Sequence, residues 1–320
     1  MKFSITEFVS YLLVVSLCLF AGCKPLQINT LTDRLSPSNV RQWSPELAVT
    51  PSAVIDNGTI RIQNIRNLNY VTEDDFVVDY FDRTIRLNDI QSVDFIVTPF
   101  PTTAALAHTM LSFGLADGSY LGVSVEVRSE IGEKYSALLG FGNQFELTYV
   151  VADERDLIRL RTRHRDDDVY VYPTIASAEQ SRELFVSVME RANKLYSDPE
   201  FYHSISNNCT SNLVDHINDL KPNRVGFSWR ALLPGFSAEY AYDLGLLDNR
   251  VPFQDLKTIA YVNDLAETYH DAADFSQRIR SRRSNINRLA QGQLERNAGL
   301  NAAGQQFLDE RIATDPFRYR

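Results

Sequence analysis

Apolar and polar positions alternate along the first half of the chain. Residues 59–65 (TIRIQNI) show the period of two that is typical of a half-buried β-strand. Pro173 ends the series, after which the pattern changes. Similar runs predict further strands at residues 76–80, 93–97, 108–115, 120–128, 145–151, 157–161 and 169–172.

Two of these runs form the strongest predicted hairpin. Residues 108–115 and 120–128 flank an Asp-Gly pair, which is a strong turn signal between strands. A three-residue loop at 116–118, with Gly118 in the left-handed conformation, makes the numbers of paired residues sum to 234. His108 then faces Glu126. A two-residue turn would instead place Val127 opposite His108.

After Pro173 the apolar positions follow helical spacing. A helix is predicted to begin after Ser177, which forms a capping box with Gln180, and to end at Asp198-Pro199. A second helix begins at Cys209 and ends at Lys221-Pro222, and a third spans residues 256–269. Strands followed by helices predict the α+β class, with an antiparallel sheet and an appended C-terminal helical region.

The N-terminus reads as a lipoprotein signal. Residues 8–20 are almost entirely apolar, which is the length of a signal core and short for a membrane span. Small residues before Cys23 resemble a lipobox, so we expect Cys23 to carry lipid; the alternative is a plain secretory signal. The predicted division is a signal peptide at 1–22, a tether at 23–44, a thiol domain at 45–250 and a helical extension at 251–320.

Composition narrows the function classes. The net charge of −9 argues against a nucleic-acid-binding protein, which would normally be basic. The sequence contains no Walker loop, dinucleotide fingerprint or His-x-x-x-His pair, so neither a cofactor nor a metal is predicted. Of three cysteines, Cys18 leaves with the signal and Cys23 carries lipid, so Cys209 remains unpaired. An unpaired thiol in an exported protein is a candidate nucleophile.

The surroundings of Cys209 favour a reactive thiol. Asn207 and Asn208 are good N-cap residues, so Cys209 falls in the first turn of a helix. Backbone N–H groups there stabilise a thiolate and can hold an oxyanion, and we assign Asn208 and Thr210 to this support. The alternative is a buried cysteine that acts as a small apolar residue.

His108 is the predicted base and Glu126 the carboxylate that orients it. Together with Cys209 they form a nucleophile, base and orienter, and Ser124 and Arg128 share the face of Glu126 as further support. The alternative is a structural histidine–carboxylate pair in a sheet.

Two other histidines and a run of arginines are weaker candidates. His203 is the second candidate base, while His216, seven residues beyond Cys209 on one helix, is about 10 Å away along the axis. Arg159, Arg161 and Arg163 alternate along the strand predicted at 157–161. They form either an anion-binding strip or, as is more usual, a solvated face.

A series of short segments points to one family by its order and spacing from about residue 43 to 283. The segments are Trp43-Ser44-Pro45-Glu46, Asn64-Ile65-Arg66, Ala107-His108-Thr109 with Ser112-Phe113, Ser124-Val125-Glu126-Val127-Arg128, Tyr170-Val171-Tyr172-Pro173, Phe201-Tyr202, Asn207-Asn208-Cys209-Thr210, Leu232-Leu233-Pro234-Gly235 and Phe275-Ser276-Gln277-Arg278-Ile279-Arg280. In these segments the chain resembles the family of the Lnb N-terminal periplasmic domain.

The resemblance implies a papain-like thiol fold of the permuted NlpC/P60 type, with histidine before cysteine. It also implies lipoprotein N-acylation, in which Cys209 takes an acyl chain from a phospholipid as a thioester and passes it to a lipoprotein amine. His108 would move the proton. The family's namesakes carry a C-terminal membrane portion, which this sequence lacks, so the lipid on Cys23 would hold the domain at the membrane. We expect a periplasm-facing position, at the outer membrane.

Two other functions remain open. One is a peptidoglycan or peptide amidase that uses the same three residues. The other is a non-catalytic envelope lipoprotein that binds partners through its basic C-terminal segment, residues 278–283.

Overall fold

The computed structural model describes residues 36–101, 103–134, 136 and 139–313. Contacts divide the chain between Val40 and Arg41, and the fold is that of the larger unit, which begins at Arg41. The predicted signal peptide, Cys23 and most of the tether lie outside the described residues.

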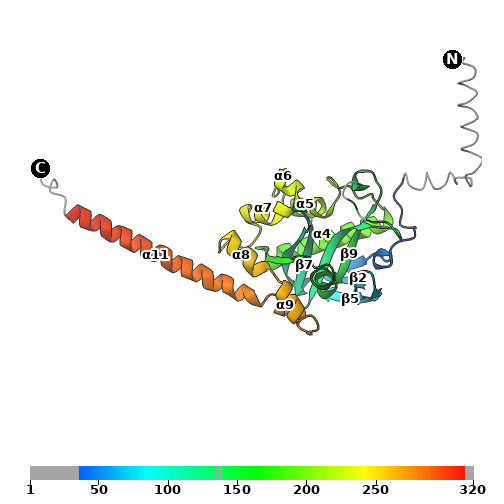
Figure 1. Ribbon diagram of the computed structural model, residues 1–320, viewed down its shortest axis with the longest axis horizontal. Coiled ribbons are helices and arrows are strands. Elements are labelled where there is room, and N and C mark those ends of the chain that lie inside the picture. Colours follow the sequence, from blue (N-terminus) through cyan, green and yellow to red (C-terminus); the bar gives the residue numbers. More distant parts are fainter. Residues whose placement is uncertain (1–35, 102, 135, 137–138, 314–320) are drawn as a thin grey trace, which may run out of the picture. The chain divides into compact units, whose positions relative to one another are not determined.

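An eight-stranded sheet forms the centre of this unit (Figure 1). Its strands are β1 (Ser52–Asp56), β2 (Thr59–Arg66), β5 (Tyr80–Arg86), β6 (Ile90–Phe100), β7 (Thr103–Leu115), β8 (Tyr120–Arg128), β9 (Glu146–Asp153) and β10 (Tyr170–Pro173). They run in the order β1-β2-β9-β8-β7-β6-β10, and β5 also pairs with β2. The pairing is antiparallel except between β2 and β9. β3 (Asn69–Tyr70) and β4 (Phe76–Val77) form a separate pair.

The predicted hairpin is confirmed, including its register. β7 pairs with β8 from Gly114↔Tyr120 to Met110↔Ser124, so paired numbers sum to 234. Gly118 has a φ of 83°, as the three-residue loop requires. The pairing stops at Met110, although both strands continue. His108 and Glu126 lie in the part where β7 and β8 no longer pair with each other, although β7 still pairs with β6 there and β8 with β9.

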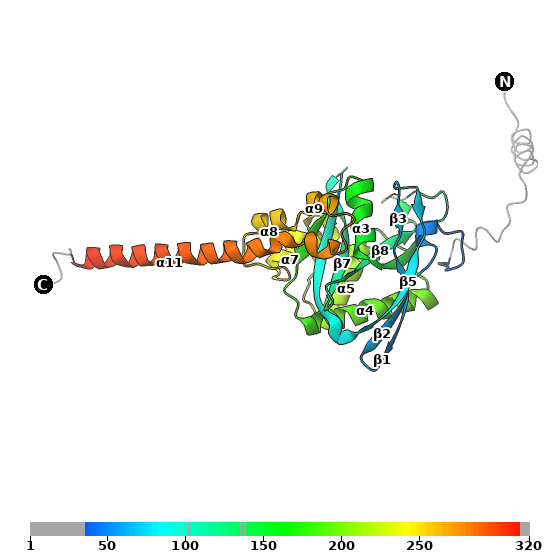
Figure 2. The ribbon, with the colours of Figure 1, turned by 90° about the horizontal axis from the view of Figure 1, so that it is seen from below.

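Helices cover both faces of the sheet (Figure 2). On one face α4 (Ala178–Ser197) and α5 (Cys209–Leu220) pack against the apolar side chains of Leu111 and Phe113. On the other face α3 (Glu154–Arg159) packs against Met110, which alternates with those two residues along β7. The observed molecule therefore has the predicted α+β composition, a mostly antiparallel sheet followed by helices.

The later helices are packed into the same unit, except that the last helix is packed only near its start, at Ile286 (Figure 1). They are α6 (Trp229–Leu232), α7 (Ser237–Asp243), α8 (Phe253–Ala260), α9 (Asn263–Thr268), α10 (Phe275–Arg278) and α11 (Ser284–Ala313), with short 3₁₀ turns η1 (Pro45–Leu47), η2 (Leu87–Asp89), η3 (Leu139–Phe141), η5 (Pro234–Phe236) and η6 (Ser281–Arg283). Leu256 and Ile259 of α8 share a core cluster with Val97 and Tyr172 of the sheet. Phe275 and other residues beyond 251 are likewise buried against the sheet-and-α3 core.

Two element predictions were wrong. Residues 157–161, predicted as a strand, lie in α3 and in a π-helical turn, η4 (Leu160–His164). Arginines at every second position suggested a strand. In a strand, however, Leu157 and Ile158 would point to opposite faces, whereas both are buried in one core cluster, and Leu160 is buried in another. The helix predicted at 256–269 is two helices, broken where Tyr261 adopts an extended conformation and forms a bridge with Tyr170 of β10.

Candidate active site

Cys209 is the first residue of α5, as the cap signal predicted. The side chain of Asn208 accepts hydrogen bonds from the backbone N–H groups of Thr210 and Ser211, and Ser211 completes a capping box. The cap fixes the direction of the first turn, and Cys209 itself is 7% exposed. The thiol therefore lies at a helix start, almost removed from solvent.

His108 and Glu126 lie together through Ser124. The Nε2 atom of His108 lies 2.6 Å from the Oγ atom of Ser124 and 3.3 Å from Oε1 of Glu126. The Ser124 hydroxyl donates to the same carboxylate oxygen over 2.5 Å. The predicted pair thus exists with a hydroxyl between its members.

This chain of contacts assigns the tautomer of His108. Because the single hydroxyl hydrogen of Ser124 goes to Glu126, the Ser124 oxygen must accept from Nε2–H of His108. Nδ1 is then the ring nitrogen that remains for Cys209. A base with its outer nitrogen held by a carboxylate network is the usual arrangement for activating a nucleophile.

The charges of the three groups support an ion pair. Burial alone would lower the pKa of His108, but the negative charge of Glu126 and the hydrogen bond to Cys209 raise it to about 9. Burial would raise the pKa of the Glu126 carboxyl, yet His108 and Arg161 hold it well below its usual value. Burial would also raise the pKa of the Cys209 thiol, but a hydrogen bond and the charge of His108 lower it to about 7. Between about pH 7 and 9 the favoured state is a thiolate beside an imidazolium.

Thr109 is a contributor that the sequence reasoning missed. Its hydroxyl and its backbone N–H both lower the pKa of Cys209 through hydrogen bonds. The hydroxyl also lies 3.2 Å from that of Thr210, whose oxygen is 3.8 Å from the sulfur. The position of Thr109, directly after the predicted base, was the one available signal.

Arg161, predicted to lie in an anion-binding strip or on a solvated face, is instead buried beside Glu126, a role that the sequence reasoning missed. Its guanidinium lies 3.1 Å from Oε1 of Glu126 and its side chain is buried. The π-helical turn η4 directs it there, whereas Arg159 pairs with the exposed Asp271 and Arg163 with Glu267. Arg161 keeps Glu126 ionised, and π-helical turns of this kind are often found at functional sites.

The oxyanion donors are fewer than predicted. Asn208 occupies the N–H groups of Thr210 and Ser211, so these do not face a substrate. The first-turn donor that remains is the N–H of Cys209, which lacks an intrahelical partner by its position. The Asn208 amide donates to the carbonyl of Ser204 and holds the preceding loop. Asn208 and Thr210 therefore shape the helix start.

Arg128, predicted as support, holds the segment before β1. Its guanidinium donates to the carbonyls of Leu47 and Ala48 and lies 4.3 Å from the ring centre of Trp43. Arg161 takes the place beside Glu126 that Arg128 was expected to occupy. His203, the second candidate base, receives contacts from Ile205 and Ser206 in its own turn.

A cleft of about 1060 Å³ opens at the site. His108, Glu126 and Cys209 line it. Its remaining walls divide into apolar side chains, among them Phe100, Leu106, Phe141, Ile205, Trp229 and Leu233, and charged ones, among them Glu73, Asp74, Lys134, Arg161, Arg165 and Asp167. An amphiphile with an apolar chain and a polar head fits such a lining.

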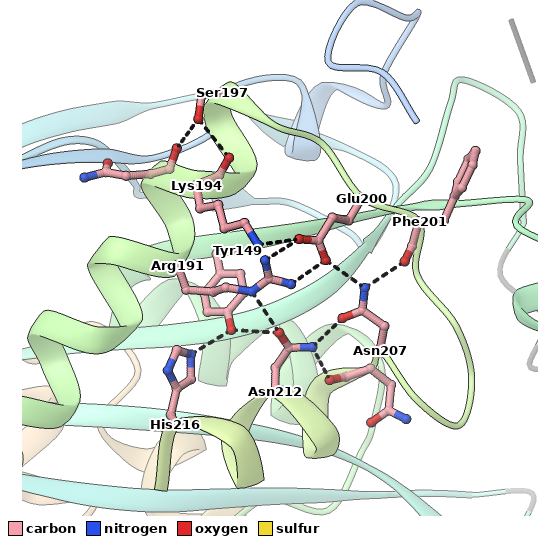
Figure 3. A network of polar contacts seen from close by, with 11 residues as sticks. Tyr149, Arg191, Lys194, Ser197, Glu200, Phe201, Asn207, Asn212 and His216 are labelled. Carbon is pink, nitrogen blue, oxygen red and sulfur yellow. Dashed lines mark hydrogen bonds and ion pairs between the residues drawn. The ribbon is translucent and has the colours of Figure 1, made fainter. Parts of the chain in front are cut away.

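A second polar network joins α5 to α4 and to the loop that precedes α5 (Figure 3). Arg191 of α4 makes two short contacts with Glu200, at 2.6 and 2.7 Å, and Glu200 accepts from the amide of Asn207. Asn212 donates to Asn207 and accepts from the hydroxyl of Tyr149. This network fixes the loop directly before Cys209, so it helps to position the nucleophile.

The network ends at His216, two turns along α5. The Nε2 atom of His216 lies 2.8 Å from the hydroxyl of Tyr149, and Nδ1 lies 2.8 Å from that of Ser187 (Figure 3 shows the Tyr149 contact). Burial lowers the pKa of His216 to about 4. His216 is therefore a neutral structural residue, in keeping with its predicted distance from the thiol.

The basic segment near the C-terminus is paired within the fold. Arg280 contacts Asp94 and Glu154 in a buried cluster, and Arg283 contacts Asp94. Arg278 and Arg282 pair with Asp274 and Asp264, respectively.

Comparison with known families gives one match. Residues 77–235 match the model described as the Lnb N-terminal periplasmic domain. The matched segment includes His108, Glu126 and Cys209, and it supports this family and a periplasm-facing location. Searches of the curated proteins and of the solved structures returned no match.

Two further observations concern membranes and metals. None of the helices in the described part of the chain has both the length and the hydrophobicity to span a bilayer. Within the same residues, His, Cys, Asp and Glu side chains do not gather into a group of three or more that could hold a metal ion.

Proposed function

We propose that the chain, which resembles the Lnb N-terminal periplasmic domain over residues 77–235, is a thiol acyltransferase of the bacterial envelope. One observation carries the proposal: Cys209 starts α5 with its pKa lowered to about 7 beside a histidine whose outer nitrogen is held by Ser124 and Glu126. The order of His108 before Cys209 agrees with the permuted NlpC/P60 arrangement that the resemblance implies. The predicted lipid on Cys23 would keep the domain at the membrane.

The first half of the reaction forms a thioester. The Cys209 thiolate attacks the carbonyl carbon of a lipid ester, and the N–H of Cys209 stabilises the oxyanion. As the ester C–O bond breaks, His108 gives its Nδ1 proton to the leaving alcohol. The acyl chain is then bonded to sulfur, and His108 is neutral.

The second half transfers the chain. An amine attacks the thioester carbonyl, His108 takes one proton from its nitrogen, and the C–S bond breaks to return the thiolate. The charge of Glu126 stabilises the imidazolium that forms again. If water replaces the amine, the same steps give hydrolysis, which is how an amidase or esterase of this type would work.

Intact-mass analysis tests the proposal. We expect wild-type protein incubated with an activated fatty-acyl ester to gain the mass of one acyl group, and Cys209→Ala to gain none. His108→Ala should gain it at least about a hundredfold more slowly, since a general base contributes about 10²–10⁴. His270→Ala, in which a partly exposed histidine outside the cleft lining is removed, is the matched control.

The acceptor separates the alternatives. Addition of an amine-bearing lipopeptide should discharge the thioester into an amide if the protein is a transferase, whereas discharge only to the free acid indicates a hydrolase. Cleavage of cell-wall peptides without acyl transfer would support the amidase. A Cys209→Ala variant that retains full acylation would rule out the thiol mechanism.

A further inference from the structure

The apolar walls of the active-site cleft continue onto the outer surface. Phe141, Ile205, Trp229 and Leu232 all line the cleft with Cys209, yet their residues are 49%, 51%, 58% and 41% exposed, respectively. They come from three separate segments, η3, the turn before α5, and α6. We call these four residues the apolar rim. Large side chains half exposed around one opening are not explained by the core.

The surroundings of the rim favour a lipid bilayer over a protein as the partner. Phe227, two residues before Trp229, is 93% exposed and follows the exposed Gly226. A protein partner would need a complementary pocket for each protruding ring, whereas lipid chains adapt to the rings without shape complementarity. Tryptophan is the residue most suited to the boundary between headgroups and chains. Exposed apolar groups of this kind mark interaction sites.

Charge in the same cleft agrees with a lipid headgroup. Lys134 is exposed and lines the cleft, in the loop that also carries Phe141. An ammonium group at an apolar rim is complementary to a lipid phosphate. Glu73, Asp74 and Glu133 line the same cleft, so its charged wall carries both signs and suits a zwitterionic headgroup such as that of phosphatidylethanolamine, while the apolar wall suits the acyl chains.

We propose that the apolar rim and Phe227 insert into the surface of a phospholipid bilayer, so that an acyl chain enters the cleft directly from the membrane. The inference rests on the proposed function for the nature of the substrate, but the membrane contact itself does not need the thiol to react. The rim would lie at the level of the headgroups and upper chains, with Cys209 above it.

The two tryptophans of the chain make a direct test possible. Trp43 is 7% exposed under Arg128, so Trp43→Phe leaves Trp229 as the single probe. The full chain, reconstituted with phosphatidylethanolamine–phosphatidylglycerol vesicles, is measured with and without lipids brominated on the acyl chains. We expect a shift of Trp229 emission to shorter wavelength and at least about twofold quenching by the brominated lipids.

A matched probe gives the control. Tyr196 on α4 has the same exposure as Trp229, 58%, and does not line the cleft. The triple variant Trp43→Phe, Trp229→Phe, Tyr196→Trp should show no quenching in the same vesicles. Equal quenching at both positions, or none at Trp229, would overturn the proposal. Quenching that requires a protein partner in addition to lipid would also overturn it.

A kinetic arm uses Phe227→Ser, which removes an exposed ring outside the cleft lining. Acyl transfer from vesicle-borne lipid should fall about tenfold, the equivalent of losing part of one buried aromatic side chain. Turnover of a short-chain soluble ester should stay within about twofold. An equal loss of rate with the vesicle-borne lipid and with the soluble ester would contradict insertion of the rim into the bilayer.

The two proposals can fail separately. If Cys209→Ala keeps the quenching of Trp229, the membrane contact holds whatever the chemistry proves to be. If wild type turns over the soluble ester but Trp229 is not quenched, the thiol chemistry holds and the rim fails.

Discussion

One histidine beside the nucleophile and another two turns along its helix have opposite charge preferences. The pKa of His108 is raised to about 9 and that of His216 is lowered to about 4, although burial acts in the same direction on both. His108 has Glu126 3.3 Å from its ring, whereas the hydrogen bonds that the described residues make to His216 come from the hydroxyls of Tyr149 and Ser187. A carboxylate in direct contact therefore separates a site suited to proton transfer from a structural one.

The two networks also differ in what their arginines do. Arg161 pairs with the carboxylate that faces His108, so its charge acts on the reactive groups. Arg191 pairs with Glu200 and holds a loop, and its charge also lowers the pKa of His216. The network around Glu126 thus acts on the charge of the nucleophile, whereas the network around Arg191 and Glu200 positions it.

Removal of the two imidazoles should give the largest contrast. His108→Ala is expected to slow acylation of Cys209 by about a thousandfold, because the thiol loses its base and its charged neighbour. His216→Ala should change that rate by less than about tenfold, since its ring only packs and hydrogen-bonds. Single-turnover acylation followed by mass spectrometry measures both, and near-equal losses would remove the distinction between the two sites.

Acid should act on stability through His216. The unfolded chain binds a proton near pH 6.5, but the folded chain binds it at about 4, so stability is present above 6.5 and is lost as pH falls toward 4. The contribution is on the order of 3 kcal/mol. Urea midpoints at several pH values should show this loss in wild type and a smaller loss in His216→Gln.

His108 changes the stability of the fold with pH in the opposite direction to His216. Its raised pKa gives stability below about 6.5 that is lost as pH rises through about 9. A wild-type protein with the same urea midpoint at pH 4.5 and 7 would contradict the assignment of His216.

Arg191→Met should destabilise the fold by roughly 2 kcal/mol, because Glu200 loses two charge-assisted hydrogen bonds. The effect is moderate since both side chains retain some contact with water. Chemical denaturation measures it, and the pH at which Cys209 reacts should stay near 7. A shift of that pH would show that the network around Arg191 and Glu200 also affects the pKa of the thiol.

Glu126→Gln should have the smallest effect in free energy but the clearest signature. Without the carboxylate charge the pKa of His108 falls, the imidazolium is lost at neutral pH, and the pKa of Cys209 rises toward its ordinary value. The alkylation rate with iodoacetamide at pH 7 should fall about tenfold. Glu200→Gln is the control, and an unchanged alkylation profile in Glu126→Gln would show that Glu126 does not set the charge of the pair.

The sequence predicted those features that depend on local chemistry. The Asp-Gly pair predicted the hairpin register and Asn208 predicted the helix start, and these two signals single out Cys209, His108 and Glu126 as candidates for one site. The sequence did not predict Arg161, because the spacing of Arg159, Arg161 and Arg163 resembles a strand while the π-helical turn depends on tertiary packing. The contacts of His216 with Tyr149 and Ser187 were equally hidden, since each comes from a different element. Local pattern identifies candidates, but their partners are set by distant segments.

The loop at residues 116–118 tolerates some substitutions but not insertions or deletions. It lies at the closed end of the hairpin, at the opposite end from His108 and Glu126, and it touches neither. Substitutions of Ala116 or Asp117 keep its length and the left-handed Gly118, and with them the register of the strands, whereas a side chain at Gly118 would be strained by its φ of 83°. A one-residue insertion or deletion would move β8 by one position and turn Ser124 and Glu126 to the opposite face of the sheet. For this chain, therefore, a gap in a short surface loop far from the thiol would disrupt the site, and the length of the loop together with Gly118 is what sets the register.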